Sequence, residues 1–397
     1  MHREDFPLLS KDIIYFDNGA TTLKPKCVID AINDYYSNYS ANAHRGDYDI
    51  SYKVDTLFED TRIKIAQFIN SDKSEVVFTY GCTDSLNIIS NGLFKNVLNK
   101  DDEVLLSLSE HASNVLPWFK LAKEIGIKVN YIDLDDDLSI TLDNVKKAIT
   151  DKTKVISLAG MTNVIGDIRP IKEICEYAHK HNIYVVVDGA QSVPHTKVDV
   201  KELDCDFLCF SGHKMCGPTG IGVLYGKKEL LDQIDPVRLG GGMNESFDSI
   251  DEVYLKEVPT RLEAGTPNIA GVIGLGSAID YLNNVGMDNI HKYELELKEY
   301  LVSKLINIPH IQIVNKNSKS GVLSFNVEGV FAQDVAYYLN KYNICVRAGN
   351  HCAKILKNAI GIKNTVRVSL YFYNTKEEID KLVELLIDKN KIVNEMI

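Results

Sequence analysis

The sequence predicts an α/β fold: a large domain with a mostly parallel central sheet flanked by helices, followed by a smaller C-terminal α+β domain. Strand-like and helix-like segments alternate along the first two thirds of the chain, which is typical of a sheet covered by helices. Several predicted strands, such as residues 183–187, are continuous apolar runs, and strands of this kind are buried on both faces. The length of 397 residues is sufficient for two domains.

The large domain is predicted to cover residues 17–285. Apolar periodicity and turn residues define its elements. The expected helices are 28–39, 55–69, 84–93, 118–125 and 171–181. The expected strands are 75–79, 103–108, 128–132, 155–158, 183–187, 207–210 and 221–225.

The small domain is predicted to cover residues 286–397. Helices are expected at 267–283 (leading into this domain), 287–306, 332–342 and 376–390, with strands at 311–314, 322–327, 345–347 and 365–369. The extended stretch 13–16 suits either domain, and we expect residues 1–16 to pack on the small one.

The composition and the net charge argue against several classes of function. Lys and Arg number 44 against 55 Asp and Glu, so the net charge is −11. This balance argues against a nucleic-acid partner, which requires clustered basic residues. The N-terminus lacks the apolar stretch of a secretory signal, and no apolar run of 18 residues suggests a membrane span. We therefore expect a cytoplasmic protein with no membrane partner. Its eight cysteines are too few for a disulfide scaffold and are expected to be reduced.

Two strand ends carry candidate chemistry. The predicted strand 183–187 is followed by Asp188-Gly-Ala-Gln191, and the strand 207–210 is followed by Ser211-Gly-His213-Lys214. In open α/β sheets, ligands bind beyond the carboxyl ends of the strands. An Asp and a Lys at such positions suit a pyridoxal phosphate enzyme, which needs a lysine for the cofactor and an acid for its ring nitrogen. Taken alone, Asp188 could equally cap the next helix.

A zinc site at these residues is excluded by geometry. Residues 205, 209, 213 and 216 are Cys, Cys, His and Cys. Residues four apart on a strand are ~13 Å from each other, whereas zinc ligands converge at ~2.0–2.3 Å from the metal. We expect no metal.

The segment from Phe207 to Gly222 resembles the lysine motif of class V pyridoxal phosphate enzymes, which have the fold type I of aspartate aminotransferase. The resemblance implies that Lys214 holds pyridoxal 5'-phosphate covalently. Asp188 would pair with its ring nitrogen, Gln191 would bond the ring hydroxyl, and Ser211 and His213 would bind the phosphate.

Further segments match the same family. Thr83, in a strand–turn–helix segment, corresponds to a phosphate contact, although an ordinary helix cap is the alternative. The resemblance places His111 over the ring as a catalytic residue and Asn163 near the ring hydroxyl and the substrate carboxylate. Thr266, in Glu263-Ala-Gly-Thr-Pro-Asn, matches a residue that reaches the phosphate across a homodimer interface.

The segment Arg347-Ala-Gly-Asn-His-Cys352-Ala resembles that of group II (Suf-type) cysteine desulfurases. Asn42-Ala-His44-Arg45-Gly and Arg367-Val-Ser-Leu-Tyr also match this group, and the resemblance covers essentially the whole chain. It implies substrate contacts from Arg367, Arg347, Asn163 and His44. A buried structural thiol is the alternative for Cys352, but its polar loop between two arginines favours a nucleophile.

The resemblance implies a complete reaction. Lys214 removes the Cα proton of L-cysteine, and the Cys352 thiolate attacks the substrate sulfur and becomes a persulfide. Alanine leaves, and a sulfur-acceptor protein of iron–sulfur cluster or thio-cofactor assembly takes the sulfur. Adjacent side chains on an extended segment point apart, so His351 is not expected to be the base for Cys352.

Other functions remain open at this point. Selenocysteine lyase, aminotransferase and β-eliminase are alternatives within class V, and a non-catalytic sulfur-relay subunit is a third class. Departures from the family pattern occur at Cys82, where relatives often carry a hydroxyl, at Cys216, which is often aromatic, and at Lys354-Ile355, where Gln-Pro is usual. A hydroxyl missing at Cys82 predicts one phosphate contact fewer.

Overall fold

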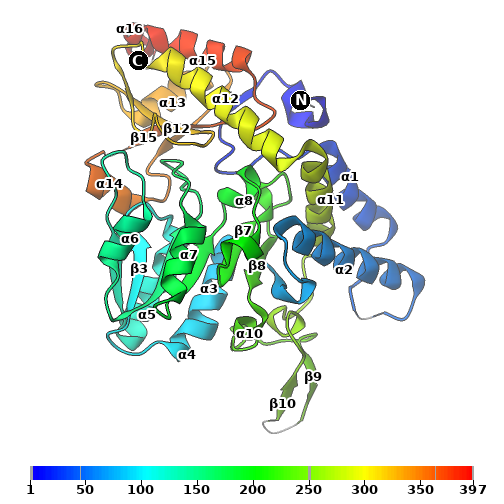
Figure 1. The fold of residues 1–397 in the computed structure, drawn as a ribbon. Helices are drawn as coiled ribbons and strands as arrows, with labels where there is room; N and C mark the ends of the chain where they lie inside the picture. Colours follow the sequence, from blue (N-terminus) through cyan, green and yellow to red (C-terminus); the bar gives the residue numbers. More distant parts are fainter. Residues whose placement is uncertain (1–2, 45, 249–251, 363, 396–397) are drawn as a thin grey trace.

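The computed structural model describes residues 3–44, 46–248, 252–362 and 364–395. A seven-stranded sheet lies at its centre (Figure 1), with the strand order β2-β8-β7-β6-β5-β3-β4. These strands are β2 Val76–Thr79, β3 Glu103–Ser107, β4 Lys128–Ile132, β5 Thr153–Ala159, β6 Tyr184–Asp188, β7 Phe207–Ser211 and β8 Gly222–Gly226. β8 runs antiparallel to β2 and β7, and the other neighbouring pairs are parallel. The predicted α/β class is confirmed.

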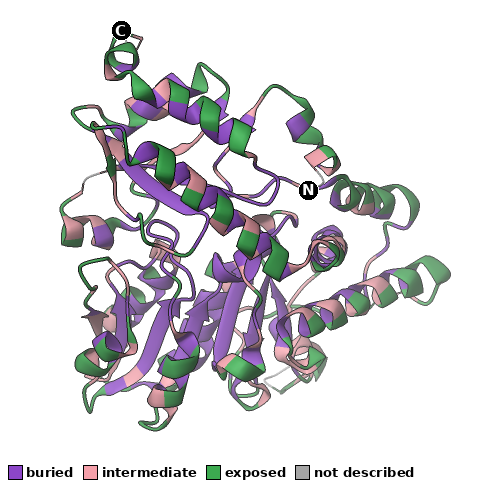
Figure 2. Ribbon diagram, turned by 45° about the horizontal axis from the view of Figure 1, so that its top comes forward, coloured by how far each residue is buried: buried purple, intermediate pink, exposed green. Residues whose placement is uncertain are grey.

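Helices cover both faces of this sheet, and the strands between them are buried (Figure 2). Successive residues of β6 divide between two apolar clusters, with Val185 and Val187 in one and Val186 in the other. This alternation is the two-residue period of a strand. The helices are α1 Lys26–Asn38, α2 Asp49–Ile69, α3 Cys82–Ile89, α4 Lys95–Val97, α5 Leu116–Ile125, α6 Leu142–Ala148, α7 Ile171–His179, α8 Ser192–His195, α9 Val200–Leu203, α10 Lys228–Leu231 and α11 Ile269–Val285.

The C-terminal part builds a second, antiparallel sheet in the order β11-β12-β15-β14. Its strands are β11 Ile311–Ile313, β12 Val322–Val327, β14 Arg347–Gly349 and β15 Thr365–Ser369, and its helices are α12 Met287–Leu305, α13 Ala332–Asn340, α14 Lys354–Ile360, α15 Lys376–Ile387 and α16 Lys389–Asn394. In the described part of the chain, no helix is long and apolar enough to cross a membrane.

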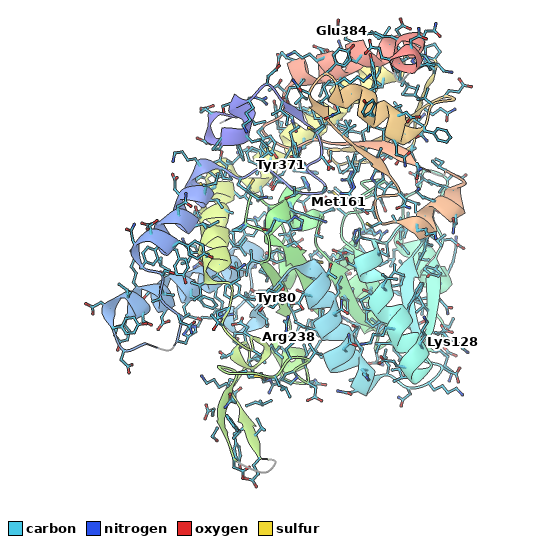
Figure 3. The ribbon with its side chains drawn as sticks, turned by 180° about the vertical axis from the view of Figure 1, so that it is seen from behind. Tyr80, Lys128, Met161, Arg238, Tyr371 and Glu384 are labelled. Atoms are coloured by element: carbon cyan, nitrogen blue, oxygen red, sulfur yellow. The ribbon has the colours of Figure 1, made fainter. Side chains whose placement is uncertain are left out.

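The N-terminal segment contacts this second part. β1 (Ile14–Tyr15) pairs in parallel with β13 (Ile344–Cys345). Phe6, however, packs edge-on against Tyr281 and Phe372, so the segment also touches α11. Seen from behind, Met161 and Tyr371 lie where the two sheets approach each other (Figure 3). The boundaries at residues 16 and 285 stay a prediction.

Several elements differ from their prediction for local reasons. The hairpin of β9 (Asn244–Phe247) and β10 (Val253–Leu255) was not predicted, because its residues are mostly exposed and show no apolar alternation. The helices α6 and α14 were also not predicted, although α6 begins with a capping box at Thr141. The predicted helix 376–390 is two helices, because the Asp388 carboxylate accepts the amides of Asn390 and Lys391 and starts α16 there.

Candidate active site

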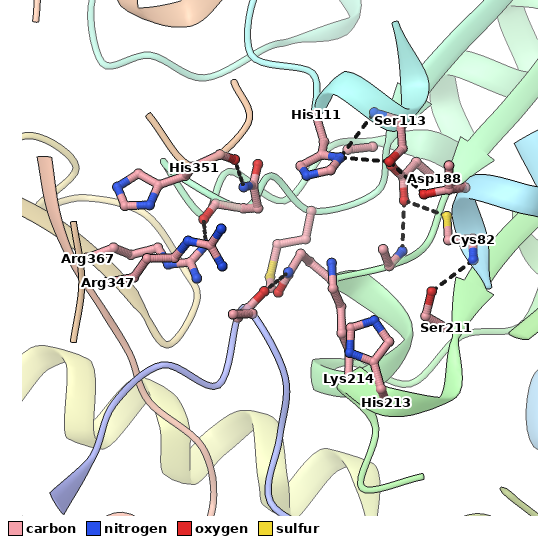
Figure 4. A pocket seen from close by; sticks show the side chains of 18 residues that line it. Cys82, His111, Ser113, Asp188, Ser211, His213, Lys214, Arg347, His351 and Arg367 are labelled. Atoms are coloured by element: carbon pink, nitrogen blue, oxygen red, sulfur yellow. Dashed lines mark hydrogen bonds between the residues drawn. The ribbon is translucent and has the colours of Figure 1, made fainter. Parts of the chain in front are cut away.

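A cavity of about 220 Å³ lies beyond the carboxyl ends of β5, β6 and β7 and is closed by residues of the second sheet (Figure 4). The register of the parallel strands creates this position, since Asp188 pairs with Ala159 on one side and Cys209 on the other. Most predicted site residues line the cavity. They are Thr83, His111, Asn163, Asp188, Gln191, Ser211, His213, Lys214, Arg347 and Arg367.

Asp188 ends β6 with a fixed carboxylate. Its Oδ1 accepts the amide of Ala190 at 3.0 Å and the thiol of Cys82 at 3.2 Å. Burial raises the pKa of Cys82 well above its ordinary value, and the Asp188 charge adds to this, so the sulfur keeps its proton and donates. Both bonds fall on Oδ1, and Oδ2 is left for a donor in the cavity.

Lys214 lies in the short turn Gly212–Lys214 that follows β7. Its side chain is half-buried and lines the cavity. Burial lowers the pKa of the Lys214 ammonium, and the nearby Asp188 charge opposes this shift. A lowered pKa favours the neutral amine, the form that acts as a nucleophile or base.

The start of α3 brings an amide and three hydroxyls together beside the cavity. The Cys82 amide donates to Ser211 Oγ at 2.8 Å, and Thr83 Oγ1 is 2.7 Å from Ser113 Oγ. Amides and hydroxyls at a helix N-terminus suit a phosphate group. The Cys82 amide lies on this side whereas its thiol bonds Asp188, and the loss of one phosphate contact at this side chain stays a prediction.

His111 carries a neutral imidazole. Burial is the main cause that lowers the pKa of His111, and the Lys214 charge adds to it. The Ser113 amide donates to Nδ1 at 3.1 Å, so the single proton of the ring lies on Nε2. An uncharged ring held in one orientation suits stacking on a flat ligand.

Arg367, in β15, is a buried cation at the opposite wall. Its Nη2 donates to Asp17 at 3.0 Å and its Nη1 to the Asn163 carbonyl at 2.9 Å, whereas its Nε has no partner. Burial lowers the pKa of Arg367, and Asp17 opposes the shift. The Cα of Gly19 lies against the guanidinium, where an added Cβ would come within 3.1 Å. The second cation, Arg347, begins β14.

Cys352 lies in a turn rather than on an extended segment, which corrects the geometry predicted for this stretch. His351 and Cys352 both have left-handed backbones, with φ values of 50° and 58°. His351 is buried and lines the cavity, whereas Cys352 is exposed. The Nε2 of His351 lies 2.9 Å from Thr365 Oγ1, and burial lowers the pKa of His351 to about 3.

Besides Cys352, two predicted site residues are not among those that line the cavity. His44 is exposed, and its ring lies 3.7 Å from the carboxylate of Asp55. It lines a second cavity together with Gly265 and Pro267, the neighbours of Thr266. Thr266 itself is exposed. Within this chain, neither residue lines the cavity with Lys214. Arg45, beside His44, lies outside the described residues.

The residues that line the cavity are suited to hold pyridoxal phosphate. Asn163 Oδ1 and Gln191 Oε1 are buried acceptors without a hydrogen-bond partner, and buried polar groups are rarely left so. A ring hydroxyl, which has one proton to donate, would give one of these two acceptors a partner. Asp188 presents a free oxygen, Lys214 an amine, and the start of α3 a phosphate site, all on one cavity.

Sequence reasoning missed two supporting contacts. One is the Asp17–Arg367 ion pair. The other is the ion pair of Glu110 and Arg169, both of whose side chains are fully buried. The one sequence signal for Glu110 is that it directly precedes His111. Nothing in the sequence around Arg169 indicates this pairing.

Comparison with known proteins identifies the family of this chain. The model of the Aminotransferase class-V family matches residues 14–382. The chain belongs to this family. It is 43% identical over 385 residues to a probable cysteine desulfurase of Halalkalibacterium halodurans, covering 96% of this chain and 95% of that protein.

Solved structures of this family have the same fold. The apo structure of a cysteine desulfurase from Thermococcus onnurineus has a TM-score of 0.93 at 38% identity, covering 97% of this chain and 96% of that one. The cysteine desulfurase CsdA of Escherichia coli, solved as an S-sulfonic acid, has a TM-score of 0.93 at 34% identity, covering 100% and 98%. The predicted family resemblance and the predicted fold are confirmed.

Proposed function

We propose that this protein is a pyridoxal phosphate-dependent cysteine desulfurase. It converts L-cysteine to L-alanine and leaves the sulfur as a persulfide on Cys352. One observation carries the proposal: Lys214, Asp188 and Arg367 line one cavity, and the turn with Cys352 is hydrogen bonded to two loops at its edge. The relatives named cysteine desulfurases support the activity.

Pyridoxal phosphate supplies an electron sink for negative charge that develops on the substrate Cα. Lys214 would hold it covalently, Asp188 would face its ring nitrogen, and Gln191 its hydroxyl. Ser211, His213 and Thr83, with the amides that start α3, would hold its phosphate. Burial, with the Lys214 charge second, lowers the pKa of His213 to about 4, so this imidazole is neutral and serves as a hydrogen-bond partner.

The side chains around the substrate divide the remaining tasks. Arg367 binds the substrate carboxylate, because a guanidinium offers paired donors to two oxygens, and Arg347 adds a second cation. Lys214 takes the proton from Cα, since its lowered pKa favours the neutral amine. His111 covers the ring face, and its uncharged imidazole leaves the electron sink unperturbed.

Cys352 accepts the sulfur. Its thiolate forms an S–S bond with the substrate sulfur while the bond from that sulfur to Cβ breaks. The electron pair of the broken bond stays with carbon, which gains a proton and leaves as alanine. The exposed position of Cys352 suits delivery of the persulfide to a sulfur-acceptor protein of iron–sulfur cluster or thio-cofactor assembly.

His44 and Thr266 support a homodimer. His44 lines a second cavity, away from Lys214, and Thr266 is the exposed residue between Gly265 and Pro267, which also line it. In a homodimer both would serve the site of a second copy. Light scattering coupled to size-exclusion chromatography tests this, and a monomer at micromolar concentration would contradict it. We retain the cytoplasm as the proposed location.

The decisive experiment is incubation with L-cysteine and a reductant, with alanine and sulfide measured for wild type and Cys352→Ser. Both products from wild type, and neither from the variant, support the proposal. Equal rates would remove Cys352 from the mechanism. Keto acid in place of alanine would indicate an aminotransferase. Alanine release from selenocysteine that survives Cys352→Ser would indicate a selenocysteine lyase.

A further inference from the structure

The turn that carries Cys352 has an unfavourable backbone. His351 and Cys352 are consecutive residues with positive φ, and a left-handed conformation is unfavourable for a residue with a side chain. The turn has one internal backbone bond, from the Ala353 amide to the Asn350 carbonyl at 2.9 Å. Such a conformation persists only where surrounding contacts determine it.

Two hydrogen bonds from the large sheet supply these contacts. The side-chain amide of Asn163 donates to the His351 carbonyl at 2.7 Å, in a buried position. The backbone amide of Ala112 donates to the Cys352 carbonyl at 2.8 Å. The carbonyl of each left-handed residue therefore accepts one hydrogen bond. The donor to His351 lies in the loop after β5, and the donor to Cys352 lies in the loop after β3.

The two donor loops are themselves fixed. The Glu110 carboxylate accepts a hydrogen bond from Arg169 and another from the Ala159 amide. The first bond connects the Ala112 loop to the end of the Asn163 loop, and the second connects it to β5. Arg367 binds the Asn163 carbonyl. A small apolar cluster that includes Val164 and Ala353 packs beside the turn. The donors are thus rigid relative to the sheet.

We propose that Asn163 and the backbone amide of Ala112 are positioning groups that hold the Cys352 turn in its left-handed conformation. We call their two hydrogen bonds the latch. Asn163 thereby has a task besides any contact with cofactor or substrate. The inference rests on the proposed function where it takes Cys352 as the nucleophile. Removing either bond lets the turn relax to ordinary backbone angles and moves the nucleophile.

The substitution Ala112→Pro tests the latch with little other change. Ala112 begins a single helical turn, where proline is tolerated, and His111 before it has the extended ψ of 147° that proline favours. The variant removes the N–H and keeps the backbone path. Ala112→Ser is the matched control, because it keeps the N–H. Asn163→Ala removes the second donor, and Asn87→Ala, at an exposed amide bonded to Thr83, is its control.

Hydrogen exchange at the Ala353 amide, followed by mass spectrometry on protein without added pyridoxal phosphate, measures how often the internal hydrogen bond of the turn opens. We expect exchange about fivefold faster in Ala112→Pro and in Asn163→Ala, the change that one ordinary hydrogen bond gives, and faster still in the double variant. The two controls should match wild type. Exchange at the wild-type rate in both single variants would overturn the latch, whatever the activity.

Kinetics separates this inference from the proposed function. In Ala112→Pro, kcat for alanine formation should fall several-fold while KM for L-cysteine stays within twofold, because Ala112 binds no substrate. Unchanged kcat with faster exchange would restrict the latch to a structural role and overturn its positioning role. Equal activity of wild type and Cys352→Ser would instead refute the nucleophile, and the exchange result would stand by itself.

Discussion

The cofactor end and the sulfur end of the proposed site are built in different ways. Asp188 and Lys214 end or follow central strands, so the sheet itself fixes their positions. Cys352 lies on an exposed turn between β14 and α14, held by donors from elsewhere in the chain. Proton transfer at one carbon requires fixed groups, whereas the proposed sulfur carrier Cys352 is exposed. The sheet therefore positions the groups that move the proton, whereas hydrogen bonds from two loops position the exposed cysteine.

Loss of Lys214 should give the largest effect, because it removes both the covalent hold on the cofactor and the base. We expect alanine formation in Lys214→Ala to fall by at least ~10²–10⁴-fold, the usual contribution of a positioned base. The visible absorption of bound pyridoxal phosphate should shift as well. Lys228→Ala, at an exposed pair with Asp232, is the control. Retention of a tenth of the activity would contradict the assignment.

Arg367→Lys should raise KM for L-cysteine by about 10–100-fold, the range for a charge-assisted bond, since an ammonium cannot replace the paired donors of a guanidinium. Comparison with cysteamine, which lacks the carboxylate, isolates this contact. Wild type should prefer cysteine strongly, and the variant should lose most of that preference. An unchanged ratio of kcat/KM for the two substrates would place the carboxylate elsewhere, with Arg347 as the next candidate.

The buried His351 should make stability depend on pH. Its pKa is lowered to about 3 by burial, against ~6.5 in an unfolded chain. Between these values the unfolded state binds one proton more, so stability rises with pH and is lost as the pH falls below ~6.5. His351→Gln should reduce the slope of unfolding free energy between pH 6 and pH 4 by about 1.4 kcal/mol per pH unit.

Urea denaturation at several pH values measures this slope. The exposed His181 provides the control, since His181→Gln should leave the slope as in wild type. An equal slope in wild type and His351→Gln would mean that His351 takes up its proton in the folded protein.

The smallest effect is expected at Cys82, whose thiol fixes Oδ1 of Asp188. Cys82→Ala should weaken pyridoxal phosphate binding to the cofactor-free protein about fivefold, the change that one hydrogen bond gives. Cys82→Ser keeps a donor and should stay within twofold of wild type. Titration of tryptophan fluorescence measures the affinity. Equal affinities for the Ala and Ser variants would show that the contact with Asp188 is dispensable.

The sequence predicted much of the site because its residues lie beside strands. Asp188, Lys214 and His111 each follow an apolar run, and the carboxyl ends of parallel strands meet at one edge of the sheet. The segments of Asn163 and Arg367 were predicted from the resemblance to the family. The contacts Asp17–Arg367 and Glu110–Arg169 were not predicted, because their partners are 350 and 59 residues apart and no periodicity links them.

The sequence by itself determined the fold class, the strand ends that bear the cofactor residues and the family motif around Cys352. These depend on short-range patterns of apolar and polar residues, which can be read along the chain. Only the tertiary structure decided that Cys82 bonds Asp188, that the Cys352 stretch is a left-handed turn and that His44 lies away from this cavity. Those features depend on which carbonyls and carboxylates meet donors from distant segments, and folding alone brings such partners together.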